Sequence, residues 1–431
     1  MKNKREMSWI LYDVGNSAFA TTIMAAVLPV FYYDVAAKGL DESLAASYWG
    51  YSQSIAVLIV AILAPVLGAV SDFSAAKKKF LMFFAFMGMI ASVLLAFVGE
   101  GAYLLASALL IVGTIGFSGG NVFYDAFLPE VSNEDNMDKV SSWGFAFGYI
   151  GGGVLFAIKL LMILNYEAFG LPSTIAGTRL AFISVGIWWL IFSIPLLKNI
   201  KEERKQQTKK ESSYIHIGFK RVGFTFKEIK KHKQVLLFLT AFWLYNDGIS
   251  TIIKMATIYG RDIGIDSNSL IIALLITQFV GIPCTFFFGF LAGKITAKKA
   301  LSFSLYIYLG IVALGYFMTS ALHFYLLAIC VGLVQGGAQS LSRSIFGKMV
   351  PGDRHAEFFG FYGISAKFSA IFGPFAFALV GQLTGSSRLG ILSLIVFFIA
   401  GIIILRFVDV EKGKEEASAQ TNPEVQTTIK T

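Results

Sequence analysis

The chain has 431 residues, of which 56% are hydrophobic and only 15% are charged. Because soluble chains carry roughly a quarter charged residues, this composition excludes an ordinary soluble domain and indicates an integral membrane protein. The net charge of +9 does not indicate nucleic-acid binding, because twelve Lys or Arg and only four Glu fall together between Lys198 and Lys233.

Twelve segments are long and apolar enough to cross a membrane, which takes about 20 mostly apolar residues. They cover approximately residues 8–33, 46–70, 80–98, 102–127, 139–165, 177–197, 234–260, 268–293, 300–318, 322–346, 356–382 and 388–408. Lys and Arg gather in the loops on one side of these spans. By the positive-inside rule, both termini are therefore expected to be cytoplasmic.

The basic segment divides the spans into six and six, so we expect an all-α membrane protein with two six-helix bundles, 1–197 and 234–409. The linker 198–233 between them is expected to be cytoplasmic. Part of it has apolar residues at helical spacing among Lys and Arg, a pattern that favours binding to anionic lipid. The polar tail 410–431 is expected to be disordered.

The two halves also resemble each other. The segment "GAVSDFSAAKK" (68–78) aligns with "GFLAGKITAKK" (289–299), at the cytoplasmic end of the second span of each half. The segment "LYDVGNS" (11–17) aligns with "LYNDGIS" (244–250) in the first span of each half. Matches in the same order along both halves indicate a structural repeat.

One loop motif points to a known superfamily. Gly68 and Asp72 are followed by a basic cluster that includes Lys77 and Lys78, and this pattern resembles the motif of the major facilitator superfamily. The segments "LYDVGNSAF", "DAFLPEV", "GFAFGYIGGG" and "AEFFGFY" are similar to the autophagy-associated vacuolar effluxer group and its bacterial relatives, also called an unknown major facilitator family. The resemblance implies a secondary transporter, and fungal members are assigned amino-acid export from the vacuole.

Polar side chains inside the first span are candidates for function. Asp13, Asn16 and Ser17 lie on one helical face. A carboxylate near the middle of a bilayer costs about 2.5–3.5 kcal/mol on insertion scales, so stability alone does not account for Asp13. We expect Asp13 either to bind a proton or a substrate ammonium, or to form an ion pair at the inner gate.

Other spans add candidates for substrate binding or proton coupling. These are Asn121, Tyr245, Asn246, Asp247, Lys254 and Lys367. Asp247 and Lys254 are two turns apart and lie on one side of their helix, and Lys254 or Lys367 could pair with Asp13 or Asp247. Lys159 lies near the outer end of the fifth span, where we expect its long side chain to reach the interface.

A second group of residues is expected to form a cytoplasmic gate. It consists of Asp72, Lys77, Lys78, Asp125 and Arg343. Asp72 is expected to cap a helix N-terminus or to pair across the two halves. Asp125 is expected to join a clamp with the basic cluster 77–79 and Lys139, and Arg343 is its counterpart in the tenth span.

Glycines at four-residue spacing occur in the fifth and eighth spans. They are Gly144, Gly148 and Gly152 in the fifth, and Gly281, Gly289 and Gly293 in the eighth, where the small residue Thr285 completes the row between Gly281 and Gly289. Small residues at this spacing let helices approach closely. Because these two spans meet at the boundary between halves in the superfamily, the glycines predict a sliding contact there.

No nucleotide-binding Gly-x-x-x-x-Gly-Lys-Ser/Thr motif is present, and the four His residues lack metal-ligand spacing. We therefore expect no enzyme activity, no cofactor and no metal. The leading hypothesis is a multi-pass transporter of the bacterial cell membrane that moves a small organic solute, with amino acids as a candidate and protons or another ion as the coupling ion. Two alternatives stay open: an exporter of amphipathic compounds or lipid precursors, and a non-transporting membrane sensor.

Overall fold

The structure is a computed structural model that describes residues 4–201, 232–352, 354–369 and 371–421. Within these ranges, twelve helical stretches are long and apolar enough to cross a membrane, so the predicted number of spans is confirmed. The N-terminal half contains α1 (Lys4–Ala18), η1 (Phe19–Ala26), α2 (Val27–Phe31), η2 (Tyr32–Ala36), α3 (Glu42–Ser74), α4 (Lys77–Leu94), η3 (Leu95–Phe97), α5 (Tyr103–Ala126), α6 (Leu128–Val131), α7 (Met137–Leu164), η4 (Tyr166–Phe169) and α8 (Thr174–Asn199).

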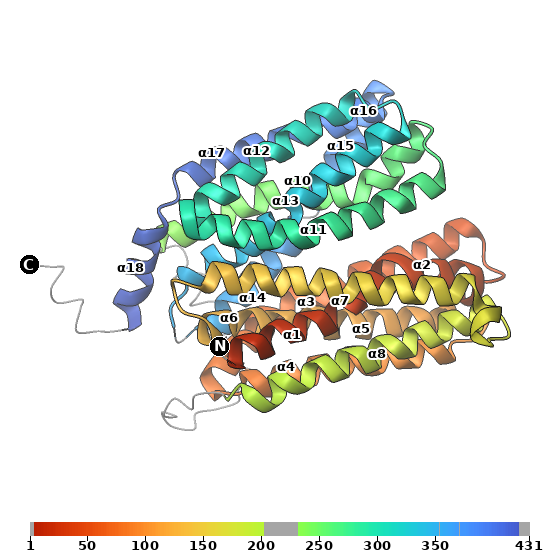
Figure 1. The fold of residues 1–431 in the computed structure, drawn as a ribbon, viewed down its shortest axis with the longest axis horizontal. Helices are drawn as coiled ribbons and strands as arrows, with labels where there is room; N and C mark the ends of the chain where they lie inside the picture. The colour runs from red at the N-terminus through yellow and green to blue at the C-terminus, as the bar shows by residue number, and fades with distance from the viewer. Residues whose placement is uncertain (1–3, 202–231, 353, 370, 422–431) are drawn as a thin grey trace, which may run out of the picture.

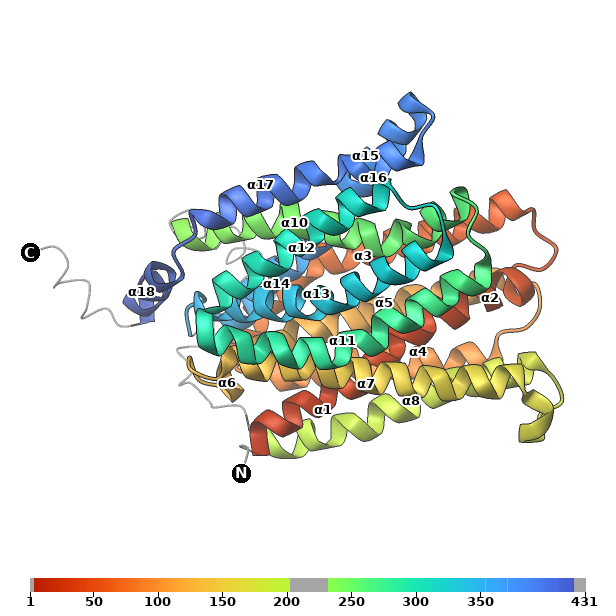
Figure 2. The same cartoon turned by 45° about the horizontal axis from the view of Figure 1, so that its top comes forward.

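The C-terminal half contains α10 (Lys233–Asp262), α11 (Ser267–Ile295), α12 (Ala297–Tyr316), α13 (Ala321–Lys348), α14 (His355–Phe368), α15 (Phe372–Thr384), α16 (Ser387–Ser393), α17 (Ile395–Arg406) and α18 (Val410–Thr421). Helices of each half form their own bundle, and α7 runs beside α11 where the two bundles meet (Figures 1 and 2). Most of the basic linker, including its proposed lipid-binding segment, lies outside the described residues.

Both described ends of the chain lie at the same end of the molecule (Figure 1), which we call the terminal end. The opposite end, which holds the α7–α8 and α12–α13 connections, is the far end. At the terminal end α3 packs against α14 across the two halves. The outer surface of both bundles exposes large apolar side chains such as Phe83, Leu314 and Leu322, as expected for contact with lipid tails.

The first span is not one regular α-helix. It begins as α1, passes through the π-helical segments η1 and η2, and has only the short helix α2 between them. π-helical turns inside helices occur frequently at functional sites. The irregular part of the first span lies beside the cavity described below.

The eleventh span is also interrupted, although the sequence predicted a single span over 356–382. Helix α14 ends at Phe368 and α15 begins at Phe372. Pro374 lies in the first turn of α15, where its missing N–H group does no harm. The N–H group of Gly373 is satisfied by Oδ1 of Asp247, at 2.8 Å. A side chain of α10 therefore caps a helix N-terminus inside the C-terminal bundle.

The start of the tail differs from the expectation. Residues 410–421 form helix α18 instead of a disordered segment. Gly413 lies against Met349 and Gln234, where a Cβ atom would collide with the Met349 side chain. Gln234 also accepts a hydrogen bond from the N–H group of Asp409, at 2.8 Å. These contacts stabilise a helix whose composition alone does not predict packing.

Candidate transport site

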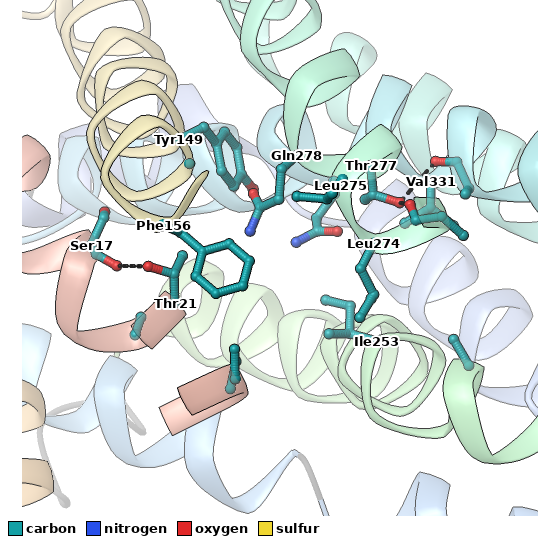
Figure 3. Close-up of a pocket in the computed structure, with 18 of the residues that line it drawn as sticks. Ser17, Thr21, Tyr149, Phe156, Ile253, Leu274, Leu275, Thr277, Gln278 and Val331 are labelled. Carbon is teal, nitrogen blue, oxygen red and sulfur yellow. Dashed lines mark hydrogen bonds between the residues drawn. The ribbon is translucent and has the colours of Figure 1, made fainter. Parts of the chain in front are cut away.

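A cavity of about 1210 Å³ lies between the two bundles. In Figure 3, residues of the first span and α7 such as Ser17, Thr21 and Phe156 face residues of α10 and α11 such as Ile253 and Gln278. The lining continues to the last turns of helices at the far end, but it does not reach the loops at the terminal end. The protein is therefore open toward the far end and closed toward the terminal end.

The N-terminal half supplies the acidic and several of the polar groups of this cavity. Asp13, Asn16, Ser17 and Asn121 all line it, so the structure brings these four predicted residues together. The Asn16 side-chain amide donates to Oδ1 of Asn121 at 2.7 Å, joining the first span to α5. Most of the remaining wall is apolar, including Phe156 and other aliphatic and aromatic side chains.

The C-terminal half supplies three glutamines that the sequence analysis missed. Gln278 of α11 and Gln335 and Gln339 of α13 line the cavity. The hydroxyl of Tyr149 in α7 donates to Oε1 of Gln339 at 3.2 Å, across the boundary between the halves. The sequence does contain a pattern that indicates two of them, because Gln335, Gln339 and Arg343 follow one another at intervals of four residues and so share one helical face.

Arg343 closes the inner end of the cavity. Its Nη1 donates to Oδ1 of Asp125 at 2.9 Å and lies 4.0 Å from Oδ2 of Asp13. Its Nε and Nη2 donate to the hydroxyl and the carbonyl oxygen of Ser141, at 3.0 and 2.9 Å. Asp125 thus pairs with Arg343 across the halves, in place of the clamp that we expected it to form with residues 77–79 and Lys139.

Aromatic rings hold the Arg343 guanidinium in position. Its carbon lies 4.8 Å from the ring centre of Trp9 and 4.3 Å from that of Phe145. Such cation–π contacts stabilise a desolvated guanidinium. A Cβ atom at Gly144 would come within 2.8 Å of Trp9 and 3.1 Å of Arg343, so the space for this arrangement depends on glycine.

The second contact at the terminal end joins α3 to α14. Oδ2 of Asp72 accepts a hydrogen bond from the N–H group of Glu357 in the first turn of α14, at 2.9 Å. A carboxylate is stabilised there by the unpaired N–H groups and by the helix dipole. One turn earlier, a Cβ atom at Gly68 would collide with the carbonyl of Ala356. The Gly-x-x-x-Asp spacing thus allows both the close approach and the cap.

Charged groups surround this cap. Lys77 lies 3.4 Å from Asp72 and also pairs with Glu130 of α6. Burial raises the pKa of the Glu130 carboxyl, but His355 and Lys77 outweigh that effect and hold the pKa at about 2. The carboxylate is therefore charged at neutral pH. Lys78 instead donates to the carbonyl oxygens of Leu197 and Ile200 at the end of α8.

A third set of contacts joins α7 to α13. The Ser141 hydroxyl donates to the carbonyl oxygen of Ser340 at 2.8 Å, and the hydroxyl oxygens of Ser142 and Ser340 lie 3.1 Å apart. Closer to the terminal end, Lys348 pairs with Asp138 at 2.6 Å. Together with Arg343 and Asp72, these contacts hold the two halves together on the terminal side of the cavity.

The remaining predicted polar residues do not line the cavity. Tyr245 shares a hydrogen bond of 2.6 Å with Ser342, and Asn246 donates to the Ser369 hydroxyl at 2.6 Å, both inside the C-terminal bundle. Asp247 is the cap of α15 described above. Lys254 is exposed and Lys367 is half-buried.

Lys254 and Lys367 do not form ion pairs with Asp13 or Asp247 in the described structure. Within the ranges that the structure describes, neither Lys254 nor Lys367 has a carboxylate within 4.0 Å. The expected pairing of one of these lysines with Asp13 or Asp247 is therefore absent from this conformation. Asp13 interacts with Arg343, and Asp247 is satisfied by the backbone of α15.

The glycines of the fifth span do not form the expected contact with the eighth span. Added Cβ atoms at Gly148 and Gly152 would meet Ser17 and Thr21 of the first span of the same bundle. One at Gly144 would meet Trp9 of that span and also Arg343 of α13, across the boundary between halves.

The eighth span fits the expected boundary better. A Cβ atom at Gly289 would come within 2.7 Å of Ser142, and one at Gly281 within 3.6 Å of Tyr149. Both neighbours belong to α7, across the boundary between halves. Gly293 is different, because a Cβ atom there would meet nothing within 4 Å. Of the three glycines predicted in α11, Gly281 and Gly289 therefore lie at the boundary between the halves and Gly293 does not.

Two six-helix bundles around a cavity that is open at one end are the architecture of the major facilitator fold. Among solved structures, the fold is similar to the proton:xylose symporter XylE, with a TM-score of 0.73 and 14% identity over 97% of this chain and 98% of that chain. It is also similar to the transporter FucP in its outward conformation, with a TM-score of 0.69 and 14% identity over 94% of this chain and 98% of that chain.

Sequence comparison identifies the family. Residues 40–137 and 132–418 match the family described as "Vacuole effluxer Atg22 like". The uncharacterized MFS-type transporter YxiO of Bacillus subtilis is 43% identical over 97% of this chain and 98% of its own length. The chain is therefore a transporter of the major facilitator superfamily and not an enzyme. Autophagy-related protein 22 of Coccidioides immitis is 27% identical over 86% of this chain and 74% of its own length. The chain belongs to the Atg22-like vacuole effluxer family.

Proposed function

We propose that this transporter moves a small organic solute by alternating access and that Asp13 binds the proton that drives it. The observation behind this proposal is the state of the Asp13 carboxylate. Its side chain is 13% exposed, it lines the cavity, and its Oδ2 makes no hydrogen bond among the described residues. Asp125, by contrast, holds Arg343 at 2.9 Å.

In this geometry Asp13 can interact either with Arg343 or with a proton or substrate ammonium that enters the cavity. A proton or a substrate ammonium that reaches Asp13 removes its attraction to Arg343, which then depends on Asp125 alone. Because Arg343 belongs to the C-terminal half, a change at Asp13 alters the contact that holds the halves together. Such differential stabilisation of one conformation is what coupling requires.

The lining of the cavity is suited to amphipathic solutes. Charged and amide groups gather at its inner end, while Phe156, Ile253, Leu274 and Val331 form apolar walls farther out. An amino acid with a large apolar side chain matches this division. An amphipathic compound or lipid precursor is the second candidate, favoured by the same apolar walls.

The orientation in the membrane is part of the proposal. The basic loops predicted to be cytoplasmic lie at the terminal end, with α4 and α12 both beginning in lysine-rich turns there. We assign the terminal end to the cytoplasm and the protein to the bacterial cell membrane. The described conformation then faces outward.

The test uses purified protein in proteoliposomes with a labelled amino-acid mixture and an imposed pH gradient. We expect Asp13→Asn to keep solute exchange but to lose gradient-driven accumulation, because exchange needs no net proton movement. Asp34→Asn is the matched control, since Asp34 also lines the cavity but lies near its mouth. Accumulation that survives in Asp13→Asn contradicts the coupling role.

Two other outcomes address the substrate. If amphipathic solutes are accumulated and amino acids are not, the second candidate replaces the first. If wild type moves neither kind of solute above the level of empty liposomes, that result favours the hypothesis of a non-transporting membrane sensor.

A further inference from the structure

Lys159 of α7 lies in an unexpected environment. Its side chain was predicted to reach the membrane interface, but it is only 1% exposed. Its Nζ donates a hydrogen bond of 2.9 Å to the hydroxyl of Thr22 in η1. Lys159 is thus buried inside the N-terminal bundle, between two of its spans.

Within the described part of the chain, no carboxylate lies close enough to Lys159 to balance a positive charge. The elements packed against α7 carry Asp13 in α1, Glu167 in η4 and Arg179 in α8, and Asp34 of η2 lines the same cavity. None of these groups forms an ion pair within 4.0 Å of Lys159 among the described residues. The charged groups of α11 and α13, which also pack against α7, are the cations Lys294, Arg343 and Lys348, and a cation cannot compensate an ammonium.

The chemistry of the pair suits both forms of the amine. Burying an uncompensated ammonium costs several kcal/mol, so the neutral amine is favoured while the site stays closed to water. A hydroxyl can donate as well as accept. Thr22 can therefore donate to the neutral amine or accept from the ammonium without any movement of the backbone.

The pair lies directly behind the cavity wall. Thr21, Phe156 and Leu160, the close neighbours of Thr22 and Lys159 in sequence, line the cavity. Thr22 itself belongs to the π-helical part of the first span. A rearrangement of this irregular segment would expose Lys159 to cavity water without unfolding a regular helix.

We propose that Lys159 and Thr22 form a proton-binding site that lacks its proton in the conformation open to the far end and takes one up in another conformation. Its ligand is a proton, and the site is separate from Asp13. Its use in transport rests on the proposed function, but proton binding itself does not.

The first test measures thermal unfolding of the full chain in lipid nanodiscs between pH 6 and pH 9. If native Lys159 is neutral, the unfolded chain binds one more proton than the native protein, so stability rises with pH. We expect the melting temperature of wild type to rise with pH relative to that of Lys159→Met. Lys294→Met, which removes an exposed lysine of α11, should follow wild type.

Two further variants separate charge from packing. Thr22→Val should lower the melting temperature but keep the pH dependence, whereas Lys159→Arg, with a permanent charge, should lose it. Lys159→Gln replaces Lys159→Met if that variant does not fold. Parallel pH curves for wild type and both neutral variants overturn the proposal, since Lys159 would then keep its proton in the native state.

The second test follows conformation by the distance between spin labels at Lys79→Cys and Lys299→Cys, which are exposed at the terminal end of α4 and α12. Cys284 and Cys330 are replaced by Ser. We expect acid to lengthen this distance in wild type but not in Lys159→Met. A pH response that persists in Lys159→Met and disappears in Asp13→Asn overturns this inference and leaves the proposed function standing.

Discussion

Arg343 has more partners across the halves than any other side chain described above. It pairs with Asp125, approaches Asp13, bonds Ser141 and stacks on Trp9. Lysine cannot reproduce these contacts, because only the planar guanidinium offers several donors and a face for stacking. The residue thus connects the closure of the terminal end to the groups at the bottom of the cavity.

This arrangement predicts strong coupling between Arg343 and Asp125. Arg343→Met should destabilise the protein by about 3–5 kcal/mol, because removal of one partner leaves a buried charge uncompensated. Adding Asp125→Asn should restore part of the loss. Denaturant unfolding of both single variants and the double variant measures the interaction. Additive effects would show that the two residues act independently.

At the residue scale, the sequence predicted the N-terminal wall of the cavity better than the C-terminal wall. A carboxylate in an apolar span is conspicuous, so Asp13 stood out. The repeat alignment, however, places Asn246 opposite Asp13 and Asp247 opposite Val14. Asp247 therefore lies one position around the helix and points to α15. The glutamines were missed because neutral amides are unremarkable in a transmembrane segment.

At the scale of elements, the crossing of α3 and α14 depends on glycines from both helices. A Cβ atom at Gly68 would collide with Ala356, and one at Gly360 would come within 2.9 Å of Ala64 and Pro65. Each obstacle is backbone, which cannot move away as a flexible side chain can. The Asp72 cap is only formed if the two helices approach this closely.

We therefore expect Gly68→Ala to weaken closure of the terminal end by about 1–3 kcal/mol, the usual cost of overpacking. The distance between spin labels at positions 79 and 299 should lengthen. Gly310→Ala is the matched control, because a Cβ atom there would meet nothing within 4 Å. That change should leave the distance unaltered. Closure that is unchanged in Gly68→Ala would contradict the role of this crossing.

The sequence predicted the number of spans but not their interruptions. Hydropathy detects the length of an apolar segment, but it does not distinguish an α-helix from a π-helix or from an interrupted helix. The gap between α14 and α15 depends on Asp247, which lies more than a hundred residues away in the chain. The same holds for α18, because its contacts with Met349 and Gln234 are tertiary.

At the scale of the whole molecule, transport requires the two halves to separate at the terminal end. Ser142 of α7 and Ser340 of α13 are suited to test this, because their hydroxyl oxygens lie 3.1 Å apart. A disulfide between Ser142→Cys and Ser340→Cys, with Cys284 and Cys330 replaced by Ser, should abolish solute flux. Reduction should restore it. Flux that continues after complete oxidation would exclude a rocking motion at this boundary.

The cavity wall is chemically unequal on its two sides. Its carboxylates, Asp13, Asp34 and Asp125, come from the N-terminal half in the described part of the chain, whereas α11 and α13 contribute the glutamines. The sequence predicts that the halves are structural repeats, yet they contribute different chemical groups to the cavity. If Asp13 couples protons as proposed, substitutions at Gln278, Gln335 or Gln339 should change which solute is accepted and leave that coupling intact, because they alter only the amide side of the cavity.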